Sequence, residues 1–271
     1  MVYPKISLVT PSYNQGPFLE GAIRSVLGQG YPDLEYFVMD GGSSDDSVET
    51  LRRWSGELTG WVSEKDGGQA SAIGKGLRRA SGQVFGWLNA DDRLVPGALD
   101  AVAKLWRENP SAAAWVGGCR RVDTAGHELS TVYPRGLPAG NVADWGRSVF
   151  FYQPACFFSA EAYQRCGDVD EARRYAMDVD LFIRLQAQGS FVSSEQVLAQ
   201  AIIHEEAKTQ AERMRMHAET IAVQVDNGYW EEAEARLKQV IGQQSRGRRT
   251  PAPRVSRRLR SWWARRASSK G

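Results

Sequence analysis

Residues 84–92 read Val84-Phe85-Gly86-Trp87-Leu88-Asn89-Ala90-Asp91-Asp92, an apolar run directly before a polar and acidic quartet. The apolar run predicts a buried strand, and the quartet marks the point where that strand meets solvent. Open α/β sheets bind ligands at the carboxyl ends of their strands. Carboxylate oxygens at such a place suit Mg²⁺ or Mn²⁺. The alternative is that Asp92 caps a helix predicted over residues 96–109.

The alternation of strand and helix patterns extends upstream of this stretch. Strands are predicted at residues 5–10, 34–39 and 61–63, and helices at residues 18–27, 46–54 and 70–80. Such alternation implies right-handed crossovers and a mostly parallel sheet. Downstream, the patterns predict a hairpin, two further strands and four helices. The hairpin is expected at 113–118 and 126–133, the strands at 157–158 and 190–201, and the helices at 160–166, 179–188, 210–225 and 230–241.

Length and composition predict one main domain. The chain has 271 residues, 42% of them hydrophobic, which is enough for one large core or two small ones. We expect a catalytic domain over residues 1–205, an accessory helical pair over 206–244 and a basic tail over 245–271. Three cysteines without a C-x-x-C pair favour neither a disulfide framework nor a zinc cluster. Without a signal-peptide pattern or a stretch near the roughly 18 apolar residues of a membrane span, we expect a cytoplasmic protein.

The basic tail differs in charge from the rest of the chain. Residues 245–271 contain nine Arg, one Lys and no acidic residue, which leaves 24 of the 34 basic residues against all 32 acidic ones elsewhere. Arginines interleaved with Leu259, Trp262 and Trp263 are typical of segments that lie on an anionic membrane surface. Nucleic-acid-binding and unstructured segments share this composition. We favour peripheral attachment at the inner face of the membrane over nucleic-acid binding.

Four acidic residues are expected at one edge of the sheet. If the strands at 5–10, 34–39 and 84–88 are parallel neighbours, the loops after them open on the same side. The carboxylates would then converge; they belong to Asp40, Asp66, Asp91 and Asp92. Clustered carboxylates repel one another unless a cation or a ligand's hydrogen-bond donors compensate them, so the pattern predicts a metal and a donor-rich base or ribose. Turn formation remains the alternative for each acid alone.

Four ordered motifs carry a resemblance to a known family. They are Ile6-Ser7-Leu8-Val9-Thr10-Pro11-Ser12-Tyr13-Asn14, Val38-Met39-Asp40-Gly41-Gly42-Ser43, Ser63-Glu64-Lys65-Asp66-Gly67-Gly68-Gln69 and Trp87-Leu88-Asn89-Ala90-Asp91-Asp92. Together they resemble the family 2 glycosyltransferases of GT-A fold. Gln153-Pro154-Ala155 and Tyr175-Ala176-Met177-Asp178-Val179-Asp180-Leu181 extend the resemblance into the acceptor half. The resemblance implies a mixed, mostly parallel sheet flanked by helices, with C-terminal helices.

The resemblance also implies a nucleoside-diphosphate sugar donor, with a UDP-sugar favoured, and a divalent cation, Mn²⁺ or Mg²⁺. Thr10, Pro11 and Tyr13 would cradle the base and ribose, Asp40 would accept a hydrogen bond from the base, and Asp66 would lie against the base or ribose. The other donor contacts would come from Gln69, Lys75, Asn89 and Asp91. The Lys75 ammonium would offset diphosphate charge, with a solvated helix lysine as the alternative.

The expected metal ligands are Asp91, Asp92 and His204. The family pattern has two acids separated by one residue, and here Asn89 replaces the first. An Asn side chain offers an oxygen but no charge, so Asp91 is expected to carry most of the cation binding, with Asp92 supporting it. His204 begins a segment, His204-Glu205-Glu206-Ala207-Lys208, that resembles a late family segment, and imidazole suits Mn²⁺. A structural histidine is the alternative.

The expected catalytic base is Asp178, which matches the acid of the acceptor-side motif. An inverting transfer needs one base for the proton of the acceptor hydroxyl and no enzyme nucleophile. The start of a helix over 179–188 would favour a carboxylate at this place. Asp180 is the alternative base or an acceptor-side residue. Gln153 is expected to shape the acceptor pocket, with loop packing as the alternative.

The function implied is hexose transfer to a hydroxyl of a glycan or a lipid-linked glycan, as in the synthesis of cell-envelope polysaccharides or glycoconjugates. One rival is a sugar-nucleotide nucleotidyltransferase, which shares the α/β plan and the metal chemistry. Such enzymes begin with a triphosphate loop rich in glycine and arginine, whereas residues 10–16 contain neither arginine nor lysine. The other rival is a catalytically silent sugar-nucleotide-binding scaffold, which the loss of an acid at Asn89 favours.

Overall fold

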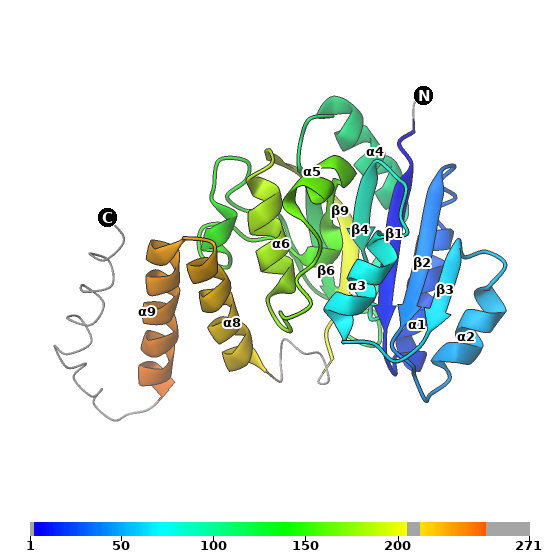
Figure 1. Cartoon of the computed structure of the whole chain (residues 1–271), viewed down its shortest axis with the longest axis horizontal. Helices are drawn as coiled ribbons and strands as arrows, with labels where there is room; N and C mark the ends of the chain where they lie inside the picture. Colours follow the sequence, from blue (N-terminus) through cyan, green and yellow to red (C-terminus); the bar gives the residue numbers. More distant parts are fainter. Residues whose placement is uncertain (1–2, 205–211, 248–271) are drawn as a thin grey trace. The chain divides into compact units, whose positions relative to one another are not determined.

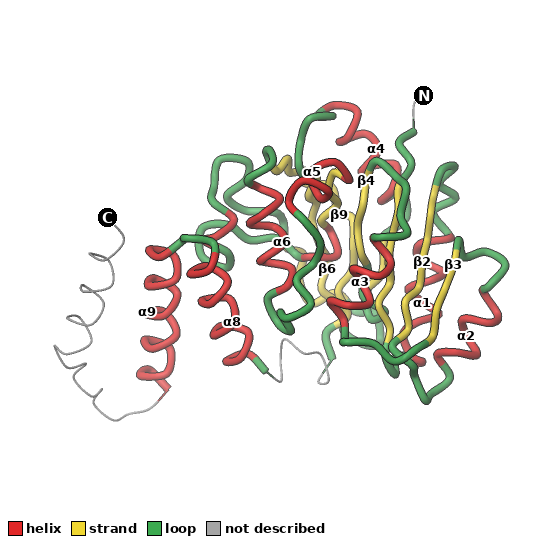
Figure 2. Tube along the Cα trace, viewed as in Figure 1, coloured by secondary structure: helices red, strands yellow, loops and turns green. Residues whose placement is uncertain are grey.

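The computed structural model describes residues 3–204 and 212–247 and contains a nine-stranded mixed sheet with helices on both faces (Figures 1 and 2). The chain divides into two compact units after Ala233, and the first unit contains the whole sheet. The strands are β1 (Ile6–Ser12), β2 (Leu34–Asp40), β3 (Gly60–Ser63), β4 (Val84–Trp87), β5 (Asp92–Leu94), β6 (Ala114–Val122), β7 (Glu128–Val132), β8 (Cys156–Ser159) and β9 (Phe191–Ile202). The α-helices are α1 (Gly16–Leu27), α2 (Ser47–Trp54), α3 (Gln69–Leu77), α4 (Ala98–Glu108), α5 (Ala160–Cys166), α6 (Met177–Gln186), α8 (Arg213–Asp226) and α9 (Trp230–Gly247).

The parallel part of the sheet is formed by its first four strands. The strand order is β3-β2-β1-β4-β8-β6-β9-β5, with β7 paired to β6. β1 pairs in parallel with both β2 and β4, as predicted, and β2 pairs in parallel with β3. Ser12 lies opposite Asp40, and Asp40 lies opposite Ser63. The ends of these three strands therefore meet at one edge of the sheet.

The other half of the sheet mixes directions. β8 is antiparallel to both β4 and β6, and the predicted hairpin of β6 and β7 is confirmed. The sequence analysis missed β5, which pairs with β9. The interpretation of Asp92 as a helix cap was wrong, because its backbone N–H closes a turn onto the carbonyl of Asn89 (3.0 Å) and the chain then enters β5. Helix α4 begins instead after Gly97, which adopts a left-handed conformation with φ of 77°.

Two hydrophobic cores cover the two faces of the sheet. Side chains alternate along each strand, so neighbours such as Leu8 and Val9 enter different cores. One core joins the sheet to α1, α2 and α4, and the other joins it to α3, α5 and α6. Figure 1 shows α3, α5 and α6 on the near face. The fold is therefore a helix, sheet, helix sandwich with the strand ends free to carry a site.

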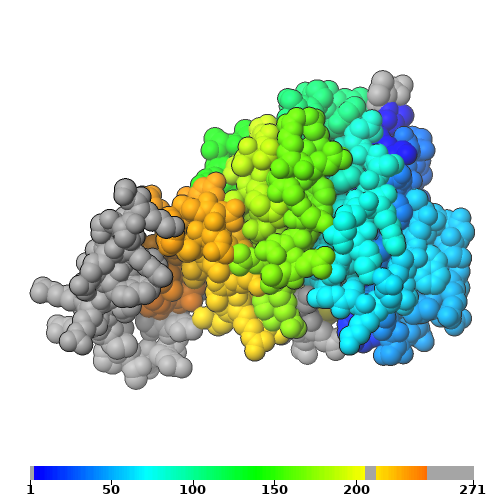
Figure 3. Space-filling view, viewed as in Figure 1, coloured from blue at the N-terminus to red at the C-terminus, as the bar shows by residue number. Residues whose placement is uncertain are grey.

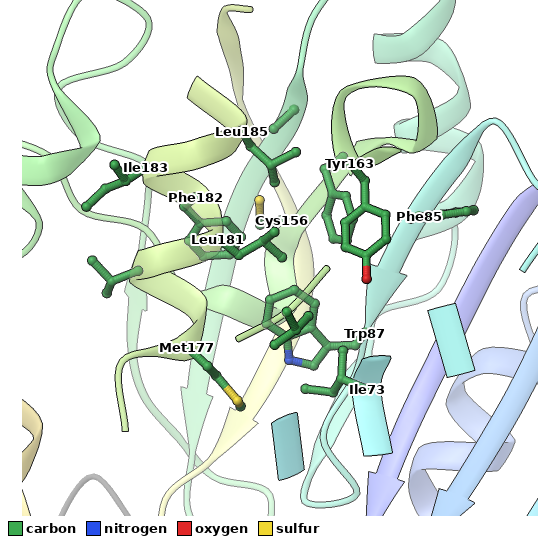
Figure 4. Close-up of a cluster of buried hydrophobic side chains, with 14 of the residues drawn as sticks. Ile73, Phe85, Trp87, Cys156, Tyr163, Met177, Leu181, Phe182, Ile183 and Leu185 are labelled. Carbon is green, nitrogen blue, oxygen red and sulfur yellow. The ribbon is translucent and has the colours of Figure 1, made fainter. Parts of the chain in front are cut away.

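The core under α6 is rich in aromatic side chains. Phe182 of α6 stacks on Trp87 of β4 with ring centroids 5.8 Å apart and on Trp145 at 5.7 Å. Figure 4 shows Phe182 and Leu181 in this cluster with Ile73 of α3. Because the helix is anchored along its apolar face, its first turn has a fixed place relative to the end of β4.

Helix α3 approaches β1 closely at Gly76, where a larger side chain would disturb the packing. A Cβ added at Gly76 would lie 2.5 Å from a methyl carbon of Val9, so Gly76→Ala should lower the free energy of unfolding by about 1–3 kcal/mol. Val9→Ala in the same chain should recover part of this loss. Gly74→Ala is the matched control, since its Cβ would meet only the ends of the Arg78 and Asp168 side chains. Urea unfolding measures all four proteins, and equal stability of both glycine variants would contradict the packing argument.

The chain ends in two helices and a basic segment. α8 and α9 confirm the expected helical pair, although residues 210 and 211 of the expected first helix lie outside the described residues. Within the described parts of the chain, no helix is both long enough and apolar enough to cross a membrane. The tail at 248–271 also lies outside the described residues, so its membrane or nucleic-acid binding stays a prediction. The domain boundaries at 205 and 244 stay predictions as well.

Candidate active site

The loops after β1 and β2 are joined by side-chain hydrogen bonds. The backbone N–H of Asn14 donates to the Ser43 hydroxyl (2.8 Å), and the side-chain oxygen of Asn14 accepts from the backbone N–H of Ser44 (2.9 Å). Asn14 adopts a positive φ of 52°, which Asn tolerates better than most residues. The two loops therefore form one surface at the sheet edge.

Asp40 is buried and held by its own loop. Its carboxylate accepts hydrogen bonds from the backbone N–H groups of Gly42 (3.1 Å) and Ser43 (2.9 Å). The hydroxyl of Ser43 donates at 2.5 Å and that of Ser63, at the end of β3, donates at 2.7 Å. Four donors compensate the buried charge. They also fix the carboxylate at the end of β2.

The residues expected to hold the base and ribose differ in exposure. Thr10 and Pro11 are buried within β1, and the Thr10 hydroxyl pairs with the Tyr36 hydroxyl at 2.8 Å. Tyr13 is 62% exposed. An exposed aromatic ring at the carboxyl edge of a parallel sheet offers a stacking surface to a planar base. Tyr13 is therefore the residue of the three that a ligand can reach directly.

Asp66 and Gln69 lie where β3 leads into α3. The carboxylate of Asp66 accepts from the backbone N–H of Gly68 (2.8 Å) and lies against Gly41 of the neighbouring loop. The Gln69 amide donates to the side-chain oxygen of Asn89 (2.7 Å). These contacts connect the loop that holds Asp40 to the segment after β4.

Asn89 is the centre of a polar network. Besides accepting from Gln69, it donates to Asp92 (3.1 Å) and to the side-chain oxygen of Gln153 (3.3 Å). Gln153 in turn donates to the carbonyl of Trp87 (2.8 Å). A carboxylate at position 89 would lack the N–H groups that donate to Asp92 and Gln153. Asn89 therefore compensates a buried acid here, and its own oxygen is occupied by Gln69.

The two acids after Asn89 lie in different environments. Asp92 is buried, and burial together with the charge of Asp91 raises its pKa well above the usual range. Asp91 is partly exposed and contacts His204 at 3.1 Å between Oδ2 and Nε2. Of these two acids, Asp91 thus has the carboxylate that can meet a cation at low cost.

His204 is held between Asp91 and an aromatic ring. Phe18, at the start of α1, stacks on the imidazole with ring centroids 4.8 Å apart. Within residues 3–204 and 212–247, no group of three or more His, Cys, Asp or Glu side chains is arranged to hold a metal ion. The remainder of the segment that begins at His204, residues 205–208, lies outside the described residues.

Lys75 forms an ion pair with Glu64, with 2.6 Å between Nζ and Oε1. The interaction lowers the pKa of the Glu64 carboxyl group, with the hydrogen bond as the main cause. A diphosphate that binds this ammonium would share its charge with Glu64. The role of Lys75 in donor binding therefore stays a prediction.

Asp178 lies in the first turn of α6, which starts at Met177 rather than at the predicted 179. Its carboxylate accepts from the backbone N–H of Val179 (2.8 Å). Burial raises the pKa of Asp178 to about 6, and the charge of Glu219 on α8 acts in the same direction. Burial raises the pKa of the thiol of Cys156, the first residue of β8, and the charge of Asp178 acts in the same direction. This strand directly follows the short helix Gln153–Ala155.

Asp180 is engaged within the protein. Its Oδ2 accepts from Nε (2.9 Å) and Nη2 (2.8 Å) of Arg184, and its Oδ1 accepts from Asn227 (3.3 Å). Such paired hydrogen bonds between a carboxylate and a guanidinium are strong and directional. Asp180 therefore fixes α6 against the start of the segment after α8, and its oxygens are less available to a substrate than those of Asp178.

The structure links six of the fourteen expected residues through contacts at the sheet edge, namely Asp40, Asp66, Gln69, Asn89, Asp92 and Gln153. The contacts run from the Asp40 loop through Asp66 and Gln69 to Asn89, and from there to Gln153 and Asp92. Three contributors were not singled out from the sequence, namely Asn14, Phe18 and Glu219. Asn14 is the last residue of the first quoted motif. Phe18 and Glu219 lie within predicted helices and outside the quoted motifs, so nothing in the sequence distinguishes them from other helix residues.

Comparison with known proteins decides the family. The model of the family described as "Glycosyl transferase family 2" matches residues 7–167, more than half of the chain. The chain belongs to glycosyl transferase family 2. The family prediction is thereby confirmed, and the expected enzyme class, glycosyltransferase, is that of the family. The matched region contains the network around Asn89 but ends before α6.

The chain is similar in sequence to curated proteins and similar in fold to solved structures. Chondroitin synthase of Escherichia coli is 26% identical over 209 residues, which cover 75% of this chain and 29% of that protein. The chain thus spans less than a third of that relative's length. S. aureus TarS 1–349, solved with UDP-GlcNAc, superposes with a TM-score of 0.64 at 15% identity, over 82% of this chain and 66% of that one.

The mannosyltransferase PcManGT from Pyrobaculum calidifontis, solved with GDP-Man and Mn²⁺, gives a TM-score of 0.61 at 20% identity, over 100% of this chain and 82% of that one. At such identities the likeness concerns the fold alone. The expected GT-A fold is confirmed.

Proposed function

We propose that this chain moves a sugar from a nucleoside-diphosphate sugar to a hydroxyl group of a glycan or lipid-linked glycan, with inversion at the anomeric carbon. The observation that carries the proposal is the contact network at the carboxyl edge, which joins the loops after β1, β2 and β3 to Asn89, Asp92 and Gln153. The relative of similar sequence is named as a chondroitin synthase. The two solved structures of similar fold contain the nucleotide sugars UDP-GlcNAc and GDP-Man, which supports a nucleotide sugar as the donor. A UDP-sugar is our first choice of donor.

The donor is proposed to lie across this edge. Tyr13 would stack against the base, and the loop that Asp40 fixes would contact the base and ribose. Gln69 and Asn89 would lie near the diphosphate end, because their network borders Asp91. Each of these roles rests on placement at the edge of the sheet.

A divalent cation fits the residues present. Asp91 and His204 offer a carboxylate oxygen and an imidazole nitrogen 3.1 Å apart, and Mg²⁺ or Mn²⁺ sites are often completed by substrate phosphates and waters around one or two protein ligands. Asp92 is buried and accepts a hydrogen bond from Asn89, so we expect it to support the site rather than to be the main ligand. When bound, the cation would neutralise charge on the departing diphosphate.

Asp178 is proposed as the general base. Its carboxylate takes the proton of the acceptor hydroxyl while that oxygen attacks the anomeric carbon and the bond to the diphosphate oxygen breaks. One displacement of this kind inverts the configuration. A pKa of about 6 leaves the carboxylate ionised at neutral pH and closer in basicity to a useful proton acceptor than an exposed Asp. Asp180 is the weaker candidate because Arg184 pairs with it.

A panel of nucleotide sugars incubated with the purified chain, Mn²⁺ and a range of glycan acceptors tests the function. We expect release of a nucleoside diphosphate that depends on the acceptor, with one donor strongly preferred. Release of pyrophosphate would identify a nucleotidyltransferase instead, and nucleotide binding without turnover over the whole panel would identify a binding scaffold.

A further inference from the structure

The segment before α6 has no regular structure and leads directly to Asp178. Residues 173–176 lie directly before α6 and carry three successive backbone N–H groups, those of Arg174, Tyr175 and Ala176. Such groups lack partners within the helix itself. Whatever accepts their hydrogen bonds fixes the direction in which the chain enters α6.

Glu219 of α8 accepts all three hydrogen bonds. Its Oε1 receives the N–H of Arg174 (3.0 Å), and its Oε2 receives the N–H groups of Tyr175 and Ala176, the latter at 2.7 Å. Hydrogen bonds to a carboxylate are stronger than those between neutral groups, and a negative charge is favourable at a helix N-terminus. Glu219 therefore acts as a cap for the segment that enters α6, although 43 to 45 residues of sequence separate it from the three donors.

Two further contacts tie the same segment to the α8 region. Arg173 forms an ion pair with Asp226 at the end of α8 (2.5 Å), and the Tyr175 hydroxyl donates to Glu212, just before α8. Arg173 also pairs with Asp170 on its own segment (3.2 Å). α8 lies alongside α6 in Figures 1 and 3, consistent with the contacts between the two helices. The segment is thus held at both ends and in its middle.

We propose that α8 belongs to the catalytic unit and that Glu219 is a positioning residue for Asp178, with the Arg174 to Ala176 backbone as the link. The inference rests on the proposed function, because it assigns the positioned carboxylate to the acceptor. Donor contacts come from other loops, so the loss of the cap affects acceptor-dependent turnover and spares donor binding. A misplacement of about 1 Å at a reacting group can cost roughly 10²-fold in rate.

The experiment compares Glu219→Ala, Glu219→Gln and Glu231→Gln in the full chain. Glu231 is an exposed acid in the first turn of α9 and serves as the matched control. Three quantities are measured: acceptor-dependent kcat, the KM for the donor, and hydrogen exchange of residues 173–180 by mass spectrometry. We expect Glu219→Ala to lower kcat about 10- to 100-fold, to change the donor KM less than about twofold, and to speed exchange in 173–180.

The conservative variant separates positioning from simple stability. Gln at 219 keeps one accepting oxygen, so Glu219→Gln should recover most of kcat and most of the exchange protection, and it carries the test if Glu219→Ala does not fold. Wild-type kcat in Glu219→Ala, or an equal rise of donor KM and fall of kcat, would overturn the inference. If the wild-type chain transfers no sugar, the proposed function has failed, and the exchange data then decide alone: unchanged protection of 173–180 in both Glu219 variants overturns the capping role.

Discussion

Asp178→Asn should lower the turnover of sugar transfer by about 10²- to 10⁴-fold and leave donor binding intact, because general-base help is typically worth that much. Asn keeps the size of Asp and can still accept from the Val179 N–H, but it cannot take the acceptor's proton. Initial rates with saturating donor and acceptor measure the loss, and calorimetry with UDP measures binding. Asp100→Asn, an exposed acid on α4, is the control. Unchanged turnover in Asp178→Asn would refute the assignment.

The pH profile of the wild-type protein gives an independent check of the same residue. Burial raises the pKa of Asp178 to about 6, and the base must be ionised to act, so kcat should rise with pH through about 6. At one pH unit below this value only about a tenth of the groups are ionised, and one unit above it about nine-tenths are. Loss of this limb in the residual activity of Asp178→Asn would connect the limb to Asp178. A flat profile between pH 5 and 7 would disagree with the assignment.

Asp91→Asn should abolish the gain in nucleotide affinity that Mn²⁺ provides and reduce kcat/KM by at least about 10²-fold, because cation stabilisation of a transferring group is worth several kcal/mol. The substitution removes the partly exposed carboxylate that contacts His204 and keeps the side-chain volume. Titration of UDP with and without MnCl₂ measures the coupling.

Asp100→Asn is again the control for replacing an acid away from the site, and Asp92→Asn is a second variant for comparison. Because Asp92 is buried whereas Asp91 is partly exposed, Asp92→Asn should retain more of the Mn²⁺ effect than Asp91→Asn. If Mn²⁺ raised the UDP affinity of Asp91→Asn as much as that of the wild type, the cation would have to be held by other ligands.

The donor half of the fold could be predicted from the sequence because its signals are local. β4 is a continuous apolar run, β1 and β2 contain several apolar residues, and each of the three strands ends in or is soon followed by polar turn residues or acids that mark the carboxyl edge. Parallel pairing of these strands then follows from their alternation with helices. Asp40, Asp66 and Asn89 consequently lie in the region that the motifs indicated.

The remaining features depend on contacts between distant segments, which a single sequence does not reveal. β5 has three residues, begins with an acid and becomes a strand only because β9 pairs with it. Asn89 reads as a weakened metal ligand until its donation to the buried Asp92 is seen. Glu219 reads as one of several helix acids, although it caps α6 across more than 40 residues of chain from Tyr175.

The separation of the two cores by the sheet has an evolutionary and practical consequence. Helices α3, α5 and α6 pack in one core, while α1, α2 and α4 pack in the other. Segment exchange between family members could therefore replace the helices of one face as a block without repacking the opposite layer. Diversification of one layer of helices while the opposite layer stays constant is the outcome that such an architecture makes accessible to selection and to engineering.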